Sequence, residues 1–179
     1  MSNAGTLESV SERGDRVGPS IGLEPWSERD QPLLQQLLGV PEMTEHVGGP
    51  EGAEKIAERQ ARYQLPGSRQ YRIVVDGEDA GWVGYWEREW LGETVWETGW
   101  SVLPGFQGRG VASEATRQLI EIARAERTLR YVHAYPSLDN APSNAICRKV
   151  GFQLMGDYEF EYPKGNFMRC NDWRYDLLA

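Results

Sequence analysis

The sequence predicts an α/β (α+β) fold, in which an antiparallel meander of strands is combined with helices and with further strands. Alternating apolar and polar residues from 71 to 102, interrupted by glycine turns, are typical of an antiparallel meander. A longer segment at residues 109–126 has helical spacing, and strand patterns return at residues 131–135, 158–162 and 169–177. The 179 residues suffice for one domain with its own hydrophobic core.

The N-terminal residues differ from the rest of the chain. Residues 1–18 are rich in Gly, Ser, Glu and Arg and show no periodicity, so we expect a disordered or tag-like tail. Residues 19–179 contain no internal repeat and are expected to form the single domain.

The first part of that domain is expected to be mainly helical. A short strand at residues 20–26 precedes a helix at residues 28–38, whose leucines form one apolar stripe. Ser27 is a suitable N-cap for this helix and Gly39 a suitable end. A loop and a second, weakly amphipathic helix are expected to follow, at residues 41–50 and 51–63.

The meander and the segments after it follow from the same patterns. Three strands are expected in the meander, at residues 71–75, 80–88 and 94–102, with turns at Asp76-Gly77 and Leu91-Gly92. The helix at residues 109–126 presents one apolar face, formed by Ala112, Ala115, Leu119, Ile122 and Ala123. A short helix from about residue 141 is expected to end at Gly151, before the last two strands.

Composition narrows the classes of partner. The net charge of −8 argues against a basic nucleic-acid-binding surface and favours a cationic partner, although acidity also promotes solubility. No apolar run reaches the roughly 20 residues that span a membrane. Cys147 and Cys170 are not part of a CxxC pair or a Cys/His cluster, so neither a disulfide framework nor a metal site is expected. We expect a cytoplasmic protein.

Residues 100–115 have the pattern of an anion site. A strand ends at Pro104, a glycine-rich turn follows, and a helix begins at once. Gly108 and Gly110 let the backbone approach a ligand closely, and the first amides of the helix have no partner within it. The helix dipole and the charge of Arg109 add positive potential at the same place. The segment therefore predicts a site for a phosphate or pyrophosphate.

Two blocks of the sequence resemble the GCN5-related N-acetyltransferase (GNAT) superfamily. Gln107-Gly-Arg-Gly-Val-Ala112 fits that family's pyrophosphate loop for acetyl-CoA. Asn140 to Phe152 fits the late block of the subgroup that is similar to the Rim-type ribosomal-protein N-terminal acetyltransferases. The resemblance covers residues from about 20 to 177. It implies a single-domain GNAT fold, with a mixed, mostly antiparallel and partly splayed sheet flanked by helices. It also implies acetyl-CoA as co-substrate and direct acetyl transfer to an amine.

The resemblance also implies where acetyl-CoA binds. The cofactor is expected between the strand that ends near Val102 and the strand from Tyr131, with a bulge near Val102 that splays the sheet and presents a backbone amide to the thioester carbonyl. Helix capping is the alternative role for Asn140. The expected cofactor-binding residues are Val102, Leu103, Gln107, Gly108, Arg109, Gly110, Val111, Ala112, Asn140 and Asn144, with Arg148 or Lys149 near the nucleotide 3′-phosphate.

Glu97 and Ser143 are the expected catalytic residues. The amine arrives as ammonium, and Glu97, on the strand that leads to the loop, can take its proton directly or through water. The alternatives are a solvated Glu97 on an outer face of the sheet, or a Glu97 that only attracts the cation. Ser143 could orient or protonate the leaving thiolate, or simply cap its helix. Many relatives carry a tyrosine acid where this chain has Cys147, so the general acid stays open, and Cys147 itself is expected to be a buried helix residue.

Trp86 and Trp100 are the expected substrate-binding residues. Either indole, or that of Trp90, could form a wall of an acceptor pocket and hold a cation over its ring. Tryptophans that share a strand face, however, most often pack in a core. His46 and its loop are a further acceptor-site candidate.

The predicted function is acetyl-CoA-dependent N-acetylation of a primary amine. Protein N-termini, amino-acid-like metabolites, polyamines and aminoglycosides remain open as acceptors. A CoA-binding sensor or scaffold without turnover is the alternative. A dinucleotide-binding oxidoreductase is a second alternative, because Gly108-x-Gly110-x-x-Ser113 nearly matches a dinucleotide-binding loop. The strands before this loop are expected to be antiparallel, which argues against it. The strand at residues 158–162 could form a homodimer edge.

Overall fold

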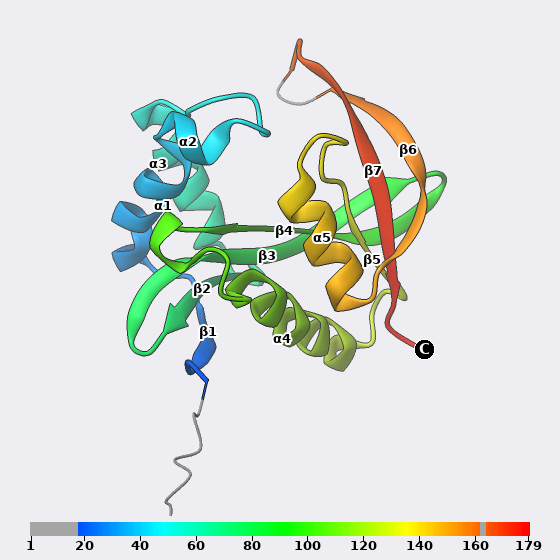
Figure 1. Ribbon diagram of the computed structural model, residues 1–179, viewed down its shortest axis with the longest axis horizontal. Coiled ribbons are helices and arrows are strands. Elements are labelled where there is room, and N and C mark those ends of the chain that lie inside the picture. The colour runs from blue at the N-terminus through cyan, green and yellow to red at the C-terminus, as the bar shows by residue number, and fades with distance from the viewer. Residues whose placement is uncertain (1–17, 162–163) are drawn as a thin grey trace, which may run out of the picture.

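The structure, a computed structural model, describes residues 18–161 and 164–179 (Figure 1). The predicted N-terminal tail therefore lies outside the described residues, apart from Gly18, and so does the last residue of the predicted strand at 158–162.

One seven-stranded sheet runs through the described part of the chain, in the order β1-β2-β3-β4-β5-β7-β6. All neighbouring strands are antiparallel except β4 and β5, which are parallel, so the predicted mixed, mostly antiparallel sheet is confirmed. The strands are β1 Ile21–Pro25, β2 Gln70–Val75, β3 Glu78–Trp90, β4 Glu93–Val102, β5 Tyr131–Ala134, β6 Gln153–Glu161 and β7 Phe167–Asp176.

The sheet divides at the β4–β5 junction. Only two register pairs join these strands, Trp96 with Val132 and Glu97 with His133. β5 ends at Ala134, whereas β4 continues to Val102, so the last part of β4 has no neighbour on that side among the described strands. The β3–β4 register runs without a shift up to Val102, so the bulge expected there is wrong. The splay arises because β5 is short.

Helices cover both faces of the sheet. The short helices α1 Gln31–Leu38, α2 Pro41–Thr44 and α3 Ala53–Tyr63 gather at one end of β3 and β4, and the β6–β7 hairpin lies at the other end (Figure 1). α4 Val111–Glu126 and α5 Ala141–Val150 pack against each other, and α4 also packs on β1, β3 and β4.

Two local expectations need correction. The predicted helix at residues 28–38 is a 3₁₀ turn, η1 Glu28–Asp30, followed by α1, whose first turn holds Pro32. The predicted loop at residues 41–50 contains the one-turn helix α2, which begins at Pro41. Proline favours the first helical turn, and a four-residue helix is too short to show a hydrophobic period.

Two apolar clusters hold the layers together. The larger lies between the sheet and α4 and includes the fully buried Trp96, Tyr85 and Leu119. The smaller joins α1 and α3 to the opposite face through Trp26, Leu34, Leu37 and Ile56, with Trp82 packed against it. β3 and β4 are therefore buried on both faces, which makes them a rigid base for a site.

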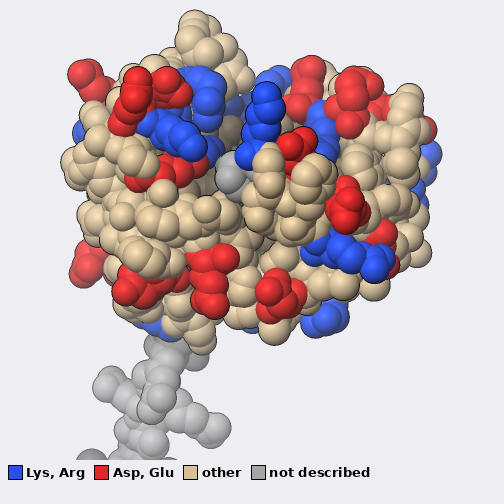
Figure 2. All heavy atoms as spheres, turned by 90° about the horizontal axis from the view of Figure 1, so that it is seen from above, with Lys and Arg blue, Asp and Glu red and all other residues tan. Residues whose placement is uncertain are grey.

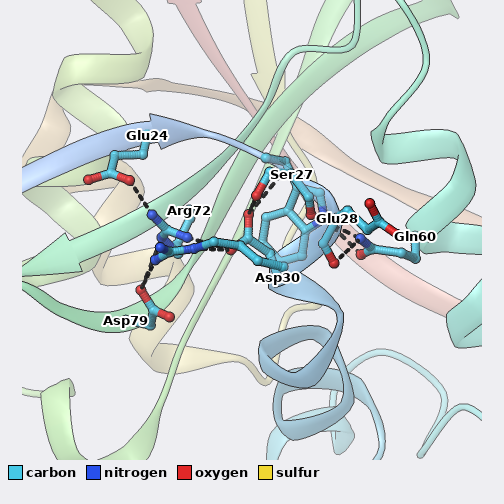
Figure 3. Close-up of polar contacts among 9 residues, drawn as sticks. Glu24, Ser27, Glu28, Asp30, Gln60, Arg72 and Asp79 are labelled. Atoms are coloured by element: carbon cyan, nitrogen blue, oxygen red, sulfur yellow. Dashed lines mark hydrogen bonds and ion pairs between the residues drawn. The ribbon is translucent and has the colours of Figure 1, made fainter.

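An ion cluster fixes the first helices to the sheet (Figure 3). The buried guanidinium of Arg72 on β2 donates to Asp30 at 2.5 Å and to Glu24, and its Nε lies 3.0 Å from Asp79. The other oxygen of Asp30 accepts hydrogen bonds from the backbone and hydroxyl groups of Ser27, at 2.7 and 3.0 Å. The cluster ties β1, β2 and β3 to the start of α1.

Among the described helices, none is both long and apolar enough to cross a membrane. Within residues 18–161 and 164–179, no group of three or more His, Cys, Asp or Glu side chains is arranged to hold a metal ion.

Candidate functional site

The loop between β4 and α4 has the predicted strand–turn–helix order. After β4, the 3₁₀ turn η2 Pro104–Phe106 leads to Gly108 and Gly110, whose φ angles are 71° and 79°. These left-handed conformations favour glycine because a Cβ would approach the following carbonyl oxygen. α4 then begins at Val111, two residues later than predicted.

Positive charge gathers at the start of α4. Its first amides have no partner within the helix, and its dipole is positive at this end. Arg109 belongs to the turn, and the Lys149 ammonium lies 3.6 Å from the position that a Cβ on Gly110 would occupy. Arg117 donates to the Lys149 carbonyl at 3.1 Å and so holds the end of α5 beside α4. The arrangement fits a pyrophosphate or phosphate group.

The side chains of Lys149 and Arg148 point to different parts of the structure. The Arg148 guanidinium lies 5.6 Å from the ring centroid of Trp173, on the side of α5 that faces β7. Of the two predicted 3′-phosphate contacts, only Lys149 therefore lies at the anion site.

Gln107 ties the loop back to β4. Its side-chain amide donates to the Val102 carbonyl at 2.8 Å, and the Leu103 amide donates to the Ala80 carbonyl at 2.8 Å. These two backbone groups are thus already bonded within the protein. Backbone groups alternate in direction along an antiparallel strand, so the Val102 N–H turns toward the edge that β5 leaves open. That N–H is the group suited to the predicted cofactor contact.

The start of α5 is a capping arrangement. The Asn140 side-chain oxygen accepts from the Ser143 amide at 3.1 Å, as the capping alternative expected. Asn144 is 3% exposed and donates to the carbonyls of Ser137 and Asn140. Its oxygen accepts from Asn171 and Trp173. Because the donors and lone pairs of its side chain are all occupied, the structure gives the Asn144 side chain a structural role, and a cofactor contact of this residue stays a prediction.

Cys147 is fully buried, as predicted. Burial raises the pKa of its thiol to about 12. A thiol enclosed in the core cannot contact a departing thiolate, so the structure gives Cys147 no catalytic role.

Glu97 lies at the point where the sheet divides, on the face that carries α1 and α3. Its Oε2 accepts from the Trp86 indole at 3.1 Å and from Arg88 at 2.7 Å. Its other oxygen, Oε1, has no bond to the described residues. The side chain is 18% exposed, so the carboxylate is both fixed and reachable.

Arg88 is a site residue that the sequence did not reveal. Its guanidinium carbon lies 4.8 Å from the ring centroids of Tyr135 and Phe160 and 5.4 Å from that of Trp90. These rings come from β3, β6 and the end of β5. No sequence spacing links them, but the alternation at residues 84–90 could have placed Arg88 on the same strand face as Trp86.

His133 and Asp172 were also missed. His133 is the register partner of Glu97, and its Nδ1 lies 2.6 Å from Asp172 Oδ1. Asp172 Oδ2 accepts from Trp90 at 2.9 Å. Both His133 and Asp172 are buried. The Tyr-Val-His-Ala-Tyr alternation of residues 131–135 was the available signal, because it sets His133 on one face with two tyrosines.

The two predicted substrate tryptophans lie on opposite faces of the sheet. Trp86 faces Glu97 and is 36% exposed. Trp100 is opposite Val83 and packs against the core under α4. Trp86 is therefore beside the candidate base, and Trp100 is not. His46 lies 3.5 Å from Asp139, so its loop reaches the start of α5.

Two surface hollows lie along α4. One, of about 590 Å³, is lined by Arg109, Gly110, Arg117 and the start of β1, and the other, of about 330 Å³, lies between α4, Val150 and Tyr175. Neither includes Glu97. Seen from above, the molecule is hollowed near its centre, with basic side chains beside the hollow and acidic ones spread around it (Figure 2).

Comparison with known proteins identifies the family. A model of the acetyltransferase (GNAT) domain matches residues 20–153. An uncharacterized N-acetyltransferase of Bacillus subtilis (strain 168), YnaD, is 29% identical over 101 residues, which are 55% of this chain and 58% of that protein. The chain thus matches little more than half the length of this relative.

Solved structures share the fold. A GNAT acetyltransferase from Bacillus anthracis superposes with a TM-score of 0.73 at 19% identity, covering 89% of this chain and 96% of the other. The aminoglycoside acetyltransferase AAC(6')-Ib in complex with coenzyme A gives 0.71 at 20% identity, with 88% and 95% covered. An acetyltransferase from Salmonella typhimurium that modifies the N-terminal serine of ribosomal protein L7/L12 gives 0.71 at 22%, with 87% and 94% covered. The chain belongs to the GNAT family of acetyltransferase domains.

Proposed function

We propose that this protein is an acetyl-CoA-dependent N-acetyltransferase that acts on a primary amine. One observation carries the proposal: Glu97 and the α4 anion site lie at the two ends of the open edge of β4. The five residue-to-residue steps from Glu97 to Val102 span roughly 17 Å at about 3.4 Å each. An extended arm anchored by its phosphates at α4 can therefore reach the carboxylate.

The residues of the anion site fit the phosphates of CoA. Gly108 and Gly110 hold left-handed conformations that other residues rarely adopt, and Arg109 and Lys149 supply two positive charges. When bound, acetyl-CoA supplies an activated thioester. The Val102 N–H can donate to the thioester carbonyl, a contact that strengthens as negative charge develops on that oxygen.

Glu97 acts as the base in this proposal. Oε1 is free to accept a proton from the incoming ammonium, while Arg88 and Trp86 hold the carboxylate through Oε2. Ser143, at the start of α5, is proposed to orient the departing thiolate, which also leaves readily because a thiol has a pKa of about 8.5.

Two observations bear on the class of the acceptor amine, namely the names of similar structures and the late block of the sequence. The names of similar structures include a ribosomal-protein N-terminal acetyltransferase and an aminoglycoside acetyltransferase. The Rim-type late block at residues 140–152 supports placing this chain nearest to that subgroup by sequence, and it leaves the acceptor open among primary amines.

A CoA-release assay against an amine panel tests the proposal. Acetyl-CoA is expected to raise the melting temperature, and at least one amine to release CoA thiol. Stabilisation by acetyl-CoA with no thiol release from any amine would instead support a CoA-binding module. Stabilisation by NAD(P)H but not by acetyl-CoA would support a dinucleotide enzyme.

A further inference from the structure

We propose that the acceptor is a small molecule with a carboxylate beside its amine, of the α-amino-acid type, and that Arg88 binds this carboxylate while Glu97 receives the amine. This inference rests on the proposed acetyltransferase function and names its substrate class. It assigns Arg88 as a specificity-determining residue.

The ion pair of Arg88 and Glu97 engages only one nitrogen and one oxygen of the two side chains. A single 2.7 Å bond joins Arg88 NH1 to Glu97 Oε2. Within the described part of the chain, the Nε and NH2 groups of Arg88 have no acceptor and Oε1 of Glu97 has no donor. The side chains are 31% and 18% exposed. The Nε and NH2 groups of Arg88 can therefore donate to a ligand, while Oε1 of Glu97, beside them, can accept from it.

Aromatic rings hold Arg88 in place. Its guanidinium lies against Trp90, Tyr135 and Phe160 at the distances given above. Stacking fixes the plane of the guanidinium and leaves its N–H edge for hydrogen bonds. The rings also exclude water from that side, which strengthens an ion pair with an incoming anion.

Tyr135 adds a second donor to the same wall. Its hydroxyl is buried and has no hydrogen-bond partner among the described residues. Burial raises the pKa of Tyr135 above its usual value, so the phenol stays protonated and can only gain by donating. Buried hydroxyls are normally paired, and this one belongs to a ring that lies against the Arg88 guanidinium.

An α-amino acid matches this arrangement. Its ammonium and carboxylate are attached to one carbon, so adjacent groups of opposite charge can bind both at once. A polyamine or aminoglycoside brings only positive charge, which Arg88 repels, and a peptide N-terminus offers a neutral carbonyl in place of the carboxylate. The net charge of −8 favours a cation, but charges beyond about 8 Å are screened, so the local pair outweighs it.

Trp86 indicates the type of side chain. It is 36% exposed and donates to the same Glu97 oxygen that Arg88 holds. An apolar or aromatic amino-acid side chain could pack on this indole, so L-phenylalanine, L-methionine and L-leucine are the first probes.

The test compares each free amino acid with its amide and with a dipeptide that begins with the same residue, at saturating acetyl-CoA. We expect kcat/KM for the free acid to exceed that of its amide by about tenfold or more, since a charge-assisted bidentate contact is lost in the amide. In Arg88→Gln this ratio should fall to about one, and Arg88→Lys should restore part of it. Arg169→Gln, an exposed arginine paired with Asp157, is the control that should keep the ratio.

The acid-to-amide ratio is measured within each variant, so partial unfolding of Arg88→Gln does not affect it. Equal or better turnover of amides, dipeptides or spermidine, or a ratio that survives in Arg88→Gln, would overturn the inference and leave the acetyltransferase function standing. Binding of acetyl-CoA with no thiol release from any probe would overturn both.

Discussion

Glu97 of β4 and His133 of β5 lie opposite each other in the last register pair before the sheet divides. Asp172 of β7 holds the His133 ring from the far side through its 2.6 Å contact. The candidate base therefore stands at the closed end of the split between β4 and β5, and its neighbours are fixed by three strands.

Replacing Glu97 with Gln tests the base. We expect kcat to fall by about 10²–10⁴-fold, because the amide cannot accept the proton, while acetyl-CoA binding stays nearly unchanged. Glu93→Gln, at an exposed position of the same strand, is the matched control. CoA release followed from pH 6 to pH 9 measures the effect, and full activity of Glu97→Gln across that profile would exclude Glu97 as the base.

Lys149 and Arg148 provide a neighbouring pair that tests the anion site. Lys149→Ala should weaken acetyl-CoA binding by two- to fivefold, or about 0.5–1 kcal/mol, because an exposed cation contributes no more than this. The loss should shrink at high salt. Arg148→Ala should bind normally, since its guanidinium lies over Trp173. Titration calorimetry that finds equal effects for both variants would contradict the assignment.

Neither cysteine should react in the native protein. Burial raises the pKa of Cys147 to about 12 and that of Cys170 to about 11, and both residues are buried. A thiol-specific reagent is expected to label neither at pH 8, and to label both after unfolding in guanidinium chloride. Rapid native labelling of Cys147 would reopen a role for it in acetyl transfer.

The ion cluster around Arg72 should stabilise the folded protein. Arg72→Met removes the cation that faces the fully buried Asp30 carboxylate, and we expect a loss of about 3–5 kcal/mol in unfolding free energy. The double variant Arg72→Met/Asp30→Asn should be less destabilised than the single one, because it removes the uncompensated charge. Urea unfolding measures both, and a double variant as unstable as or less stable than the single one would argue against a charge effect.

Glu126 should make stability depend on pH. Burial alone would raise its pKa, but hydrogen bonds from Arg69 and Tyr85, with the charge of Arg69, outweigh burial and hold the pKa below its usual value. The folded state is therefore favoured above the unfolded pKa of about 4.3, and this contribution is lost as the pH falls through the lower folded value.

The matching variant is Glu126→Gln. Its deficit in unfolding free energy relative to the parent should be constant from about pH 7 to pH 5 and should shrink below about pH 4. Glu121→Gln, at an exposed ion pair with Arg124 on the same helix, should show little such dependence. If the difference in unfolding free energy between the parent and Glu126→Gln is the same at pH 3 as at pH 7, the expectation is contradicted.

The sequence allowed most elements of the fold to be predicted, because their signals are local. The period of two in β2, β3 and β4 and the apolar stripe of α4 are visible in short windows. The positions of Gly108, Gly110 and Gly151 were equally readable, since left-handed turns require residues without a Cβ. The helix α2 was missed because four residues show no period.

The candidate site was less readable, because its contacts cross strands. Arg88, Tyr135 and Phe160 are far apart along the chain. Only the register of the strands β3, β4, β5, β7 and β6 brings them together. Asn144 shows the same limit, since its motif position predicts a cofactor contact, whereas only the folded structure shows that buried neighbours occupy the hydrogen-bonding groups of its side chain.

The sequence by itself determined the order of strands and helices, the glycine turn before α4 and the position of Glu97 on the strand that leads to it. The tertiary structure decided the end of β5, the opposite faces of Trp86 and Trp100, and the pairing of Glu97 with Arg88. The physical reason is the range of the interactions. Backbone conformation depends on neighbouring residues, whereas burial, charge pairing and strand register depend on residues that meet only when the chain has folded.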